Sequence, residues 1–320
     1  MYLPQVIIIF TIGAISAGLL TAVIIPYIKH RQFSQFVRKA GPKSHFKKEG
    51  TPTMGGIAIL CGMIMGILLD GRIGPSTYLL ISITLAYGII GFIDDYNKAI
   101  KKNNLGLRAW QKLLLQTIVA TIFAFSIVNG MKDATLVYVP FINEYIDFGS
   151  MFIPFVIFVV LAVTNSVNLT DGLDGLASGV TLIVAFTFAL IALKLGNDNM
   201  TVAMAALAGA CGGFLVHNKY PAKIFMGDTG SLALGGALVG AAVVLKMELI
   251  IPIIGLIYVL EALSVIIQVA YFKVSGGRRI FKMAPLHHHF ELGGMGEQKI
   301  VLMFYIVTII VSVLGYLIAV

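Results

Sequence analysis

Charged side chains are scarce in this sequence. Asp, Glu, Lys and Arg account for 12% of its 320 residues, whereas 58% are hydrophobic, and the mean hydropathy is +0.93. A soluble globular domain carries about 25% charged residues, so this composition excludes that class. We therefore expect a polytopic membrane protein whose residues 1–320 form a single integral membrane domain.

Cysteine is also nearly absent. The two cysteines, Cys61 and Cys211, lie inside apolar segments, and we interpret them as small buried hydrophobic residues rather than as a disulfide or a metal pair. The apolar stretch from Pro4 to Ile28 is longer than the hydrophobic region of a signal peptide, and no charged segment precedes it. We expect it to be a retained membrane span.

Apolar runs long enough to cross a bilayer as helices, about 17 to 25 residues, recur ten times. The predicted fold is therefore all-α with ten transmembrane helices. A short β-hairpin is expected near 134–148, where apolar and polar residues alternate around a turn. The predicted spans are 4–28, 53–70, 76–94, 111–130, 150–167, 175–194, 199–216, 229–246, 249–272 and 299–320.

Lysine and arginine are distributed unequally between the loops on the two sides of these spans. Nineteen of the 23 fall on one side, and four, namely Arg72, Lys132, Lys194 and Lys246, fall on the other. Because cytoplasmic loops carry the excess of positive charge, both termini and the hairpin are predicted to be extracytoplasmic. This rule and the attraction to anionic lipid headgroups explain most of the basic residues, and no nucleic-acid partner is expected.

Acidic residues stand at the edges of apolar runs, where carboxylates are costly to keep and usually functional. Asp94 and Asp95 end the third predicted span, Asp171 and Asp174 follow the fifth, and Asp228 opens the eighth. The predicted topology places all of them on the cytoplasmic side, together with the histidines at 287–289. Carboxylates with lysines nearby indicate a Mg²⁺ and phosphate site, so we expect one active site on this face.

Each acidic cluster also has a structural interpretation. Asp94 and Asp95 could be solvated charges at the membrane boundary, but acids at a helix C-terminus oppose the helix dipole and favour a partner such as Mg²⁺. Asp228 could equally be an ordinary helix N-cap. Glu261, near the middle of the ninth span, suits a packing role and a functional role equally, and is left outside the predicted site.

A polar file follows the fifth span. Asn165, Asn168, Asp171 and Asp174 recur at every third residue, so they line one face if the segment is helical or nearly so. The alternative for Asp171 and Asp174 is a solvated turn. The whole file beside an apolar helix favours a functional role.

Five motifs occur together and in order in this sequence: SHFKKEGTPTMGG (44–56), GFIDDYNK (91–98), NSVNLTDGLDGLASG (165–179), NKYPAKIFMGDTGS (218–231) and MAPLHHHFE (283–291). This set resembles the phospho-N-acetylmuramoyl-pentapeptide transferases, the MraY family. These belong to the polyprenyl-phosphate N-acetylhexosamine-1-phosphate transferase superfamily, of the glycosyltransferase family 4 type. TPTMGG and PLHHHFE are typical of the MraY branch, and Met295 departs from it because the family often has Trp there.

The resemblance implies transfer of phospho-MurNAc-pentapeptide from UDP-MurNAc-pentapeptide to undecaprenyl phosphate. The reaction needs Mg²⁺, gives lipid I and UMP, and serves peptidoglycan synthesis at the bacterial cytoplasmic membrane. A homodimer is plausible for the family. One alternative is a sister transferase that uses UDP-GlcNAc. The other is a secondary transporter, suggested by ten spans, although the acids cluster at one face rather than at the midplane.

The resemblance also implies roles for residues. Asp228 is expected to be the Mg²⁺ ligand, with Asp94 and Asp95 as further candidates. Asp94 is the candidate base or lipid-phosphate partner, and Asp95 belongs to the metal–phosphate region. The residues expected to contact phosphate or nucleotide are Lys48, Lys98, Lys112, His287 and His288. Those expected to line the uridine and sugar pocket are Asn168, Leu169, Asp171, Asp174, Asn218, Phe225 and Gly227.

Overall fold

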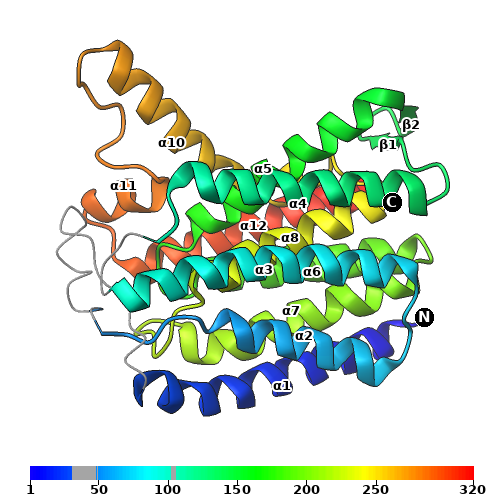
Figure 1. Cartoon of the computed structure of the whole chain (residues 1–320), viewed down its shortest axis with the longest axis horizontal. Helices are drawn as coiled ribbons and strands as arrows, with labels where there is room; N and C mark the ends of the chain where they lie inside the picture. Colours follow the sequence, from blue (N-terminus) through cyan, green and yellow to red (C-terminus); the bar gives the residue numbers. More distant parts are fainter. Residues whose placement is uncertain (31–47, 49, 102–105) are drawn as a thin grey trace.

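The computed structural model describes residues 1–30, 48, 50–101 and 106–320, and in this part of the chain nearly all regular structure is helical (Figure 1). The expected all-helical membrane architecture is confirmed. The helices are α1 Leu3–His30, α2 Gly56–Asp70, α3 Pro75–Lys101, α4 Ala109–Gly130, α5 Phe152–Thr170, α6 Leu176–Lys194, α7 Asp198–Asn218, α8 Gly227–Val244, α9 Ile251–Ile254, α10 Leu256–Val274, α11 Leu286–Leu292 and α12 Glu297–Ala319, with a short 3₁₀ turn, η2, at Gly149–Met151.

Nine helices in the described residues are long and apolar enough to cross a membrane. They correspond to nine of the ten predicted spans. The remaining one, α2, is apolar but has 15 residues, or about 22 Å at the helical rise, against a hydrocarbon core of about 30 Å. Figure 1 shows α2 running between the same two ends of the bundle as α1 and α3.

The ninth predicted span, 249–272, is interrupted. A single turn, α9, ends at Gly255, and α10 starts directly after it. A side chain at Gly255 would meet the Ile251 carbonyl oxygen at 2.8 Å and the Tyr258 ring at 2.9 Å, so the bend requires glycine. Beyond the bend α10 diverges from the bundle (Figure 1) and exposes apolar residues such as Ile266 and Phe272. The prediction of one continuous helix here was wrong.

The centre of the bundle is formed by α7 and α8, whose residues are buried on almost every face. Small residues allow this packing. A methyl group at Gly209 or Gly213 would collide with the α1 backbone at Phe10 or Ala14. This Gly-xxx-Gly spacing therefore lets α7 approach α1 closely.

The predicted hairpin consists of β1 Leu136–Val139 and β2 Glu144–Asp147, which pair antiparallel with Leu136 opposite Asp147. The Tyr138 backbone N–H donates to the Lys246 carbonyl oxygen at 3.0 Å, and its hydroxyl donates to the Ile318 carbonyl oxygen at 2.8 Å. Figure 1 shows the hairpin and both chain ends at one end of the bundle and α11 at the other.

Candidate active site

The first turn of α8 packs directly against α3, and this contact brings the acidic clusters together. A methyl group at Gly91 would overlap the backbone of Asp228, and one at Gly56 would overlap that of Gly230. Glycines on α3 and α2 therefore let both helices approach the N-terminus of α8. The positive end of the α8 dipole lies beside the acids of α3.

Asp95 is buried, at 4% exposure, and binds the start of α8 through both carboxylate oxygens. Oδ1 accepts the Asp228 backbone N–H at 3.1 Å, and Oδ2 accepts the backbone N–H of Thr229 at 2.9 Å and its hydroxyl at 2.7 Å. These N–H groups belong to the first turn of α8, where no helical carbonyl can accept them. Asp95 thus caps α8 from another helix.

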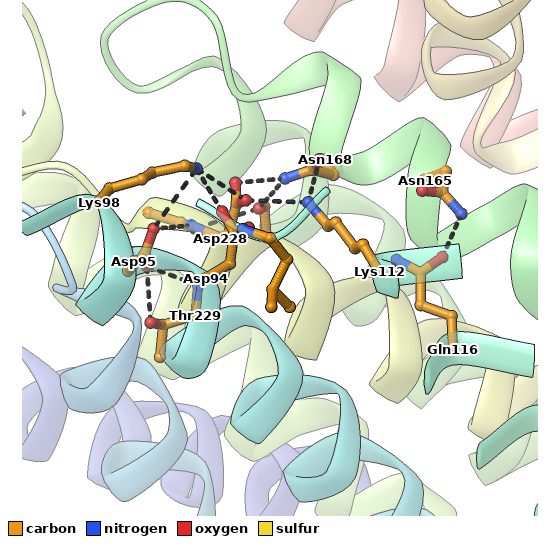
Figure 2. Close-up of polar contacts among 12 residues, drawn as sticks. Asp94, Asp95, Lys98, Lys112, Gln116, Asn165, Asn168, Asp228 and Thr229 are labelled. Atoms are coloured by element: carbon orange, nitrogen blue, oxygen red, sulfur yellow. Dashed lines mark hydrogen bonds and ion pairs between the residues drawn. The ribbon is translucent and has the colours of Figure 1, made fainter. Parts of the chain in front are cut away.

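Asp228 lies in that first turn and collects polar groups from three other helices (Figure 2). Its Oδ2 accepts hydrogen bonds from Lys98 at 3.0 Å and Lys112 at 2.9 Å, and its Oδ1 accepts one from the Asn168 amide at 2.9 Å. Asn168 also donates to the Ser231 hydroxyl at 2.7 Å. The predicted residues on α3, α4, α5 and α8 therefore meet at one carboxylate.

Asp94 completes this acidic group. Its Oδ2 pairs with Lys98 at 2.5 Å, and its Oδ1 accepts the Leu107 backbone N–H at 2.7 Å. Asp94, Asp95 and Asp228 each offer an oxygen atom within 4.8 Å of the others, a set that could hold a metal ion. Hard divalent cations such as Mg²⁺ prefer such oxygen ligands.

The predicted helix end at Asp94 and Asp95 is wrong. α3 continues to Lys101 and places Lys98 one turn beyond the acids. The partners of the two carboxylates are accordingly the α8 N-terminus and Lys98.

The polar file after the fifth span does not stay on one face, because α5 ends at Thr170. Asn165 donates to the side chain of Gln116 at 2.8 Å (Figure 2), and Asn168 binds Asp228. Asp171 and Asp174 lie in the following turn. Burial, followed by the charges of Asp228, Asp95 and Asp174, raises the pKa of Asp171 to about 8.

Lys48 and Asp174 belong to a second cluster. The Lys48 ammonium lies 2.7 Å from Asp174 and 2.5 Å from Glu297. Burial lowers the pKa of Lys48, but hydrogen bonds and attraction to these two carboxylates outweigh it, so the pKa is raised. The second Asp174 oxygen accepts the Ala222 backbone N–H at 2.9 Å.

Four further predicted pocket residues surround these two clusters. Asn218 is buried and accepts hydrogen bonds from the Gly175 backbone and the Ser178 hydroxyl, so it supports the 171–175 turn. Gly227 has φ +70°, and a methyl group there would overlap the Asp95 carboxylate. The side chains of Leu169 and Phe225 are half-buried.

His287 contacts the same turn from α11. It is 1% exposed, and a side chain at Gly172 would collide with its Nε2, an atom for which no hydrogen-bond partner is found among the described residues. Glu261 binds it twice, at the backbone N–H (3.2 Å) and at Nδ1 (3.0 Å). His288 pairs with Glu291 at 3.0 Å.

Comparisons with known proteins show which family the sequence belongs to. A family model for glycosyl transferase family 4 matches residues 77–246, and a phospho-N-acetylmuramoyl-pentapeptide-transferase signature matches residues 48–60. A protein of that name from Heliobacterium modesticaldum is 48% identical over 297 residues, which cover 92% of each chain. The chain belongs to the phospho-N-acetylmuramoyl-pentapeptide transferases. Relatives from Clostridium novyi (47% over 315 residues, 98% of this chain and 95% of theirs) and Thermoanaerobacter pseudethanolicus (48% over 313 residues, 98% of both) carry the same name.

Membership of this transferase family confirms the resemblance and the enzyme class, and it excludes the transporter alternative. Two acids at the candidate site, the buried Glu261 and the half-buried Glu297, were not predicted as site residues. Glu261 was left out because no partner is visible in its sequence neighbourhood, and His287 is 26 residues away. Glu297 opens α12 and resembles an ordinary first-turn acid. The first motif begins at residues 44–47, which lie outside the described part of the chain.

Proposed function

We propose that this enzyme transfers phospho-MurNAc-pentapeptide from UDP-MurNAc-pentapeptide to undecaprenyl phosphate at the cluster of Asp94, Asp95 and Asp228. The products are lipid I and UMP. The observation that carries this proposal is the position of the Asp228 carboxylate, within 3.0 Å of two lysines at the N-terminus of α8. Such a site combines oxygen ligands for a cation with positive charge for phosphates.

The acidic cluster suits Mg²⁺, with Asp228 and Asp94 as the residues that would hold it. Asp95 is less available because both of its oxygens bind the backbone of α8. When bound, Mg²⁺ would supply positive charge to the diphosphate of the donor and to the lipid phosphate. This assignment keeps Asp228 as the principal ligand and gives Asp95 the task of fixing the Asp228 backbone.

In the reaction, an oxygen of the lipid phosphate forms a bond to the phosphorus that carries the sugar, and the bond from that phosphorus to the UMP oxygen breaks. Lys98 and Lys112 stabilise the negative charge gathered there. The second pKa of a phosphate monoester is near 6, so the nucleophile is largely ionised at neutral pH. Asp94 then contributes by positioning more than by removing a proton.

The nucleotide half of the donor would lie between the 171–175 turn and the segment that precedes α8. Lys48 and Asp174 are hydrogen-bonding groups there, and the half-buried Phe225 ring offers a stacking surface for uracil. Mass spectrometry of a trapped phosphosugar on Asp94 or Asp95 would distinguish a two-step reaction from direct displacement.

In the membrane we propose ten crossings, with α2 as a short tenth span. The hairpin and both termini then face the outside, and the site faces the cytoplasm of a bacterial cell. The support is that both termini lie at one end of the bundle (Figure 1) and that nineteen of 23 basic residues belong to the sequence segments predicted for the other side. Association into a homodimer stays a prediction, which light scattering in detergent would test.

The decisive test is release of UMP by the purified enzyme. It should require undecaprenyl phosphate and Mg²⁺, and UDP-MurNAc-pentapeptide should be used in preference to UDP-GlcNAc. Asp228→Asn should lower turnover at least about 10³-fold. The matched control is Asp133→Asn, an exposed acid between α4 and the hairpin. Full activity of Asp228→Asn would overturn the site, and turnover with UDP-GlcNAc alone would overturn the donor.

A further inference from the structure

Glu297 connects two residues that are distant from it in sequence. It is the first residue of α12, and its side chain is 9% exposed. One oxygen, Oε1, lies 2.5 Å from the Lys48 ammonium and accepts the Asp174 backbone N–H at 2.7 Å. Because Glu297 is 249 residues from Lys48 and 123 residues from Asp174, neither contact can be predicted from the sequence.

A general helix-dipole role explains an acid at this position but not these partners. An acid in the first turn interacts with the N–H groups of its own helix. Glu297 instead shares the Lys48 ammonium with Asp174, so two carboxylates surround one cation. Removing one partner from a buried ion pair is disruptive, because the remaining charges lose their intended geometry.

The 171–175 turn has a separate anchor on α12, which keeps the two functions distinguishable. The Tyr305 hydroxyl donates to the Gly175 carbonyl oxygen at 2.6 Å, and its ring fills the space beside Gly179. The turn is therefore attached to α12 without Glu297. What Glu297 adds is the fixed distance between the Lys48 ammonium and the Asp174 main chain.

We propose that Glu297 is a positioning residue for the nucleotide donor, acting through Lys48 and Asp174 on the donor's affinity and not on the chemical step. The inference rests on the proposed function, in which Lys48 and Asp174 contact the nucleotide half. The hydrogen bonds of Glu297 go to this pair, whereas the reacting phosphates are assigned to the Asp228 cluster.

The first test is Glu297→Gln, which keeps a carbonyl oxygen for the Asp174 N–H but removes the charge that holds Lys48. The KM for UDP-MurNAc-pentapeptide should rise about tenfold, with kcat within about threefold and the KM for undecaprenyl phosphate unchanged. UMP, titrated calorimetrically, should bind about tenfold more weakly. Glu144→Gln, at an exposed acid of β2 far from the site in sequence, is the matched control and should leave both KM values unchanged.

A double-mutant cycle tests whether Glu297 acts through Lys48. In a Lys48→Met background, Glu297→Gln should add less than about twofold to the donor KM. An independent, multiplicative effect would overturn the proposal. So would an unchanged donor KM and UMP affinity in Glu297→Gln, or a parallel change in kcat and both KM values.

If Glu297→Gln does not fold, Glu297→Asp serves instead, since it keeps the charge and withdraws it by one methylene. It should raise the donor KM less than tenfold, and an unchanged donor KM would contradict the proposal. UMP binding is measured without acceptor lipid. The two failures can therefore be told apart. If the wild-type enzyme does not form lipid I, the proposed function is overturned. If the Glu297 variants bind UMP as tightly as the wild type, only the role of Glu297 is overturned.

Discussion

Asp95 provides a sharp test of how this site is built, because the structure gives its carboxylate a structural task at the start of α8. Asp95→Asn preserves the shape but replaces one acceptor oxygen with an NH₂ group. If the remaining oxygen keeps both bonds to Thr229, the new NH₂ faces the Asp228 backbone N–H, 3.1 Å from the present oxygen. The side-chain NH₂ and the Asp228 backbone N–H are both donors, and they then face each other at a residue that is 4% exposed.

The cost can be estimated from these bonds. Hydrogen bonds to a charged acceptor contribute about 1.5–3 kcal/mol each, and neutral ones about 0.5–1.5 kcal/mol. Weakening the two Thr229 bonds and losing the one from the Asp228 backbone amounts to about 3–5 kcal/mol. We expect Asp95→Asn to lower the free energy of unfolding by that amount and to reduce turnover as well, since the Asp228 backbone shifts.

Equilibrium unfolding in mixed micelles and UMP release measure the two effects separately. Thr229→Val is the matched comparison, because it removes the hydroxyl bond to Asp95 and keeps both backbone bonds. It should cost about 1.5–3 kcal/mol. If Asp95→Asn loses turnover at unchanged stability, Asp95 acts in the chemistry itself and the capping argument is refuted.

Three further predictions follow from individual positions. Gly172→Ala should lower turnover at least tenfold, because its methyl group displaces the His287 ring. Gly130→Ala, where a methyl group meets nothing within 4 Å, should keep full turnover, and equal activities of the two variants would contradict the contact between Gly172 and His287. Because the pKa of Asp171 is raised to about 8, the folded state keeps a proton that the unfolded state releases near pH 4. Stability should therefore fall as pH rises toward about 8 and level off above it; melting curves in EDTA from pH 6 to 9 should show a steeper fall in the wild type than in Asp171→Asn. Gly91→Ala should push α3 away from the first turn of α8 and reduce both melting temperature and turnover, and a fully stable, active variant would disprove the close packing.

Several features were predictable because their signals are local. Long apolar runs predicted nine spans that the structure bears out, and alternation predicted the hairpin at Leu136–Asp147. Hydropathy could not reveal that the α2 helix has only 15 residues, that α3 extends to Lys101, or that Gly255 interrupts the ninth span. Those boundaries depend on which neighbouring helix each residue packs against.

The candidate site was likewise predicted only in part. The predicted topology put Asp94, Asp95 and Asp228 on one face of the membrane, and the family resemblance added Lys98 and Lys112; the structure brings these side chains together. The sequence did not separate Lys48 and Asp174 into a second cluster. It also did not show that Glu261 pairs with His287 or that Glu297 pairs with Lys48. A buried acid looks the same in sequence whether its partner is absent or 249 residues away.

By itself, the sequence determined the class of this protein: an apolar chain must satisfy its backbone as helices in a bilayer, and carboxylates kept at the edges of apolar runs despite their desolvation cost indicate chemistry. Only the tertiary structure decided what each carboxylate does. Asp95 caps α8, Asp228 receives two lysines, and Asp174 shares Lys48 with Glu297. The reason is physical, since a carboxylate's role follows from the donors within about 3 Å of its oxygens, and here those donors come from distant helices.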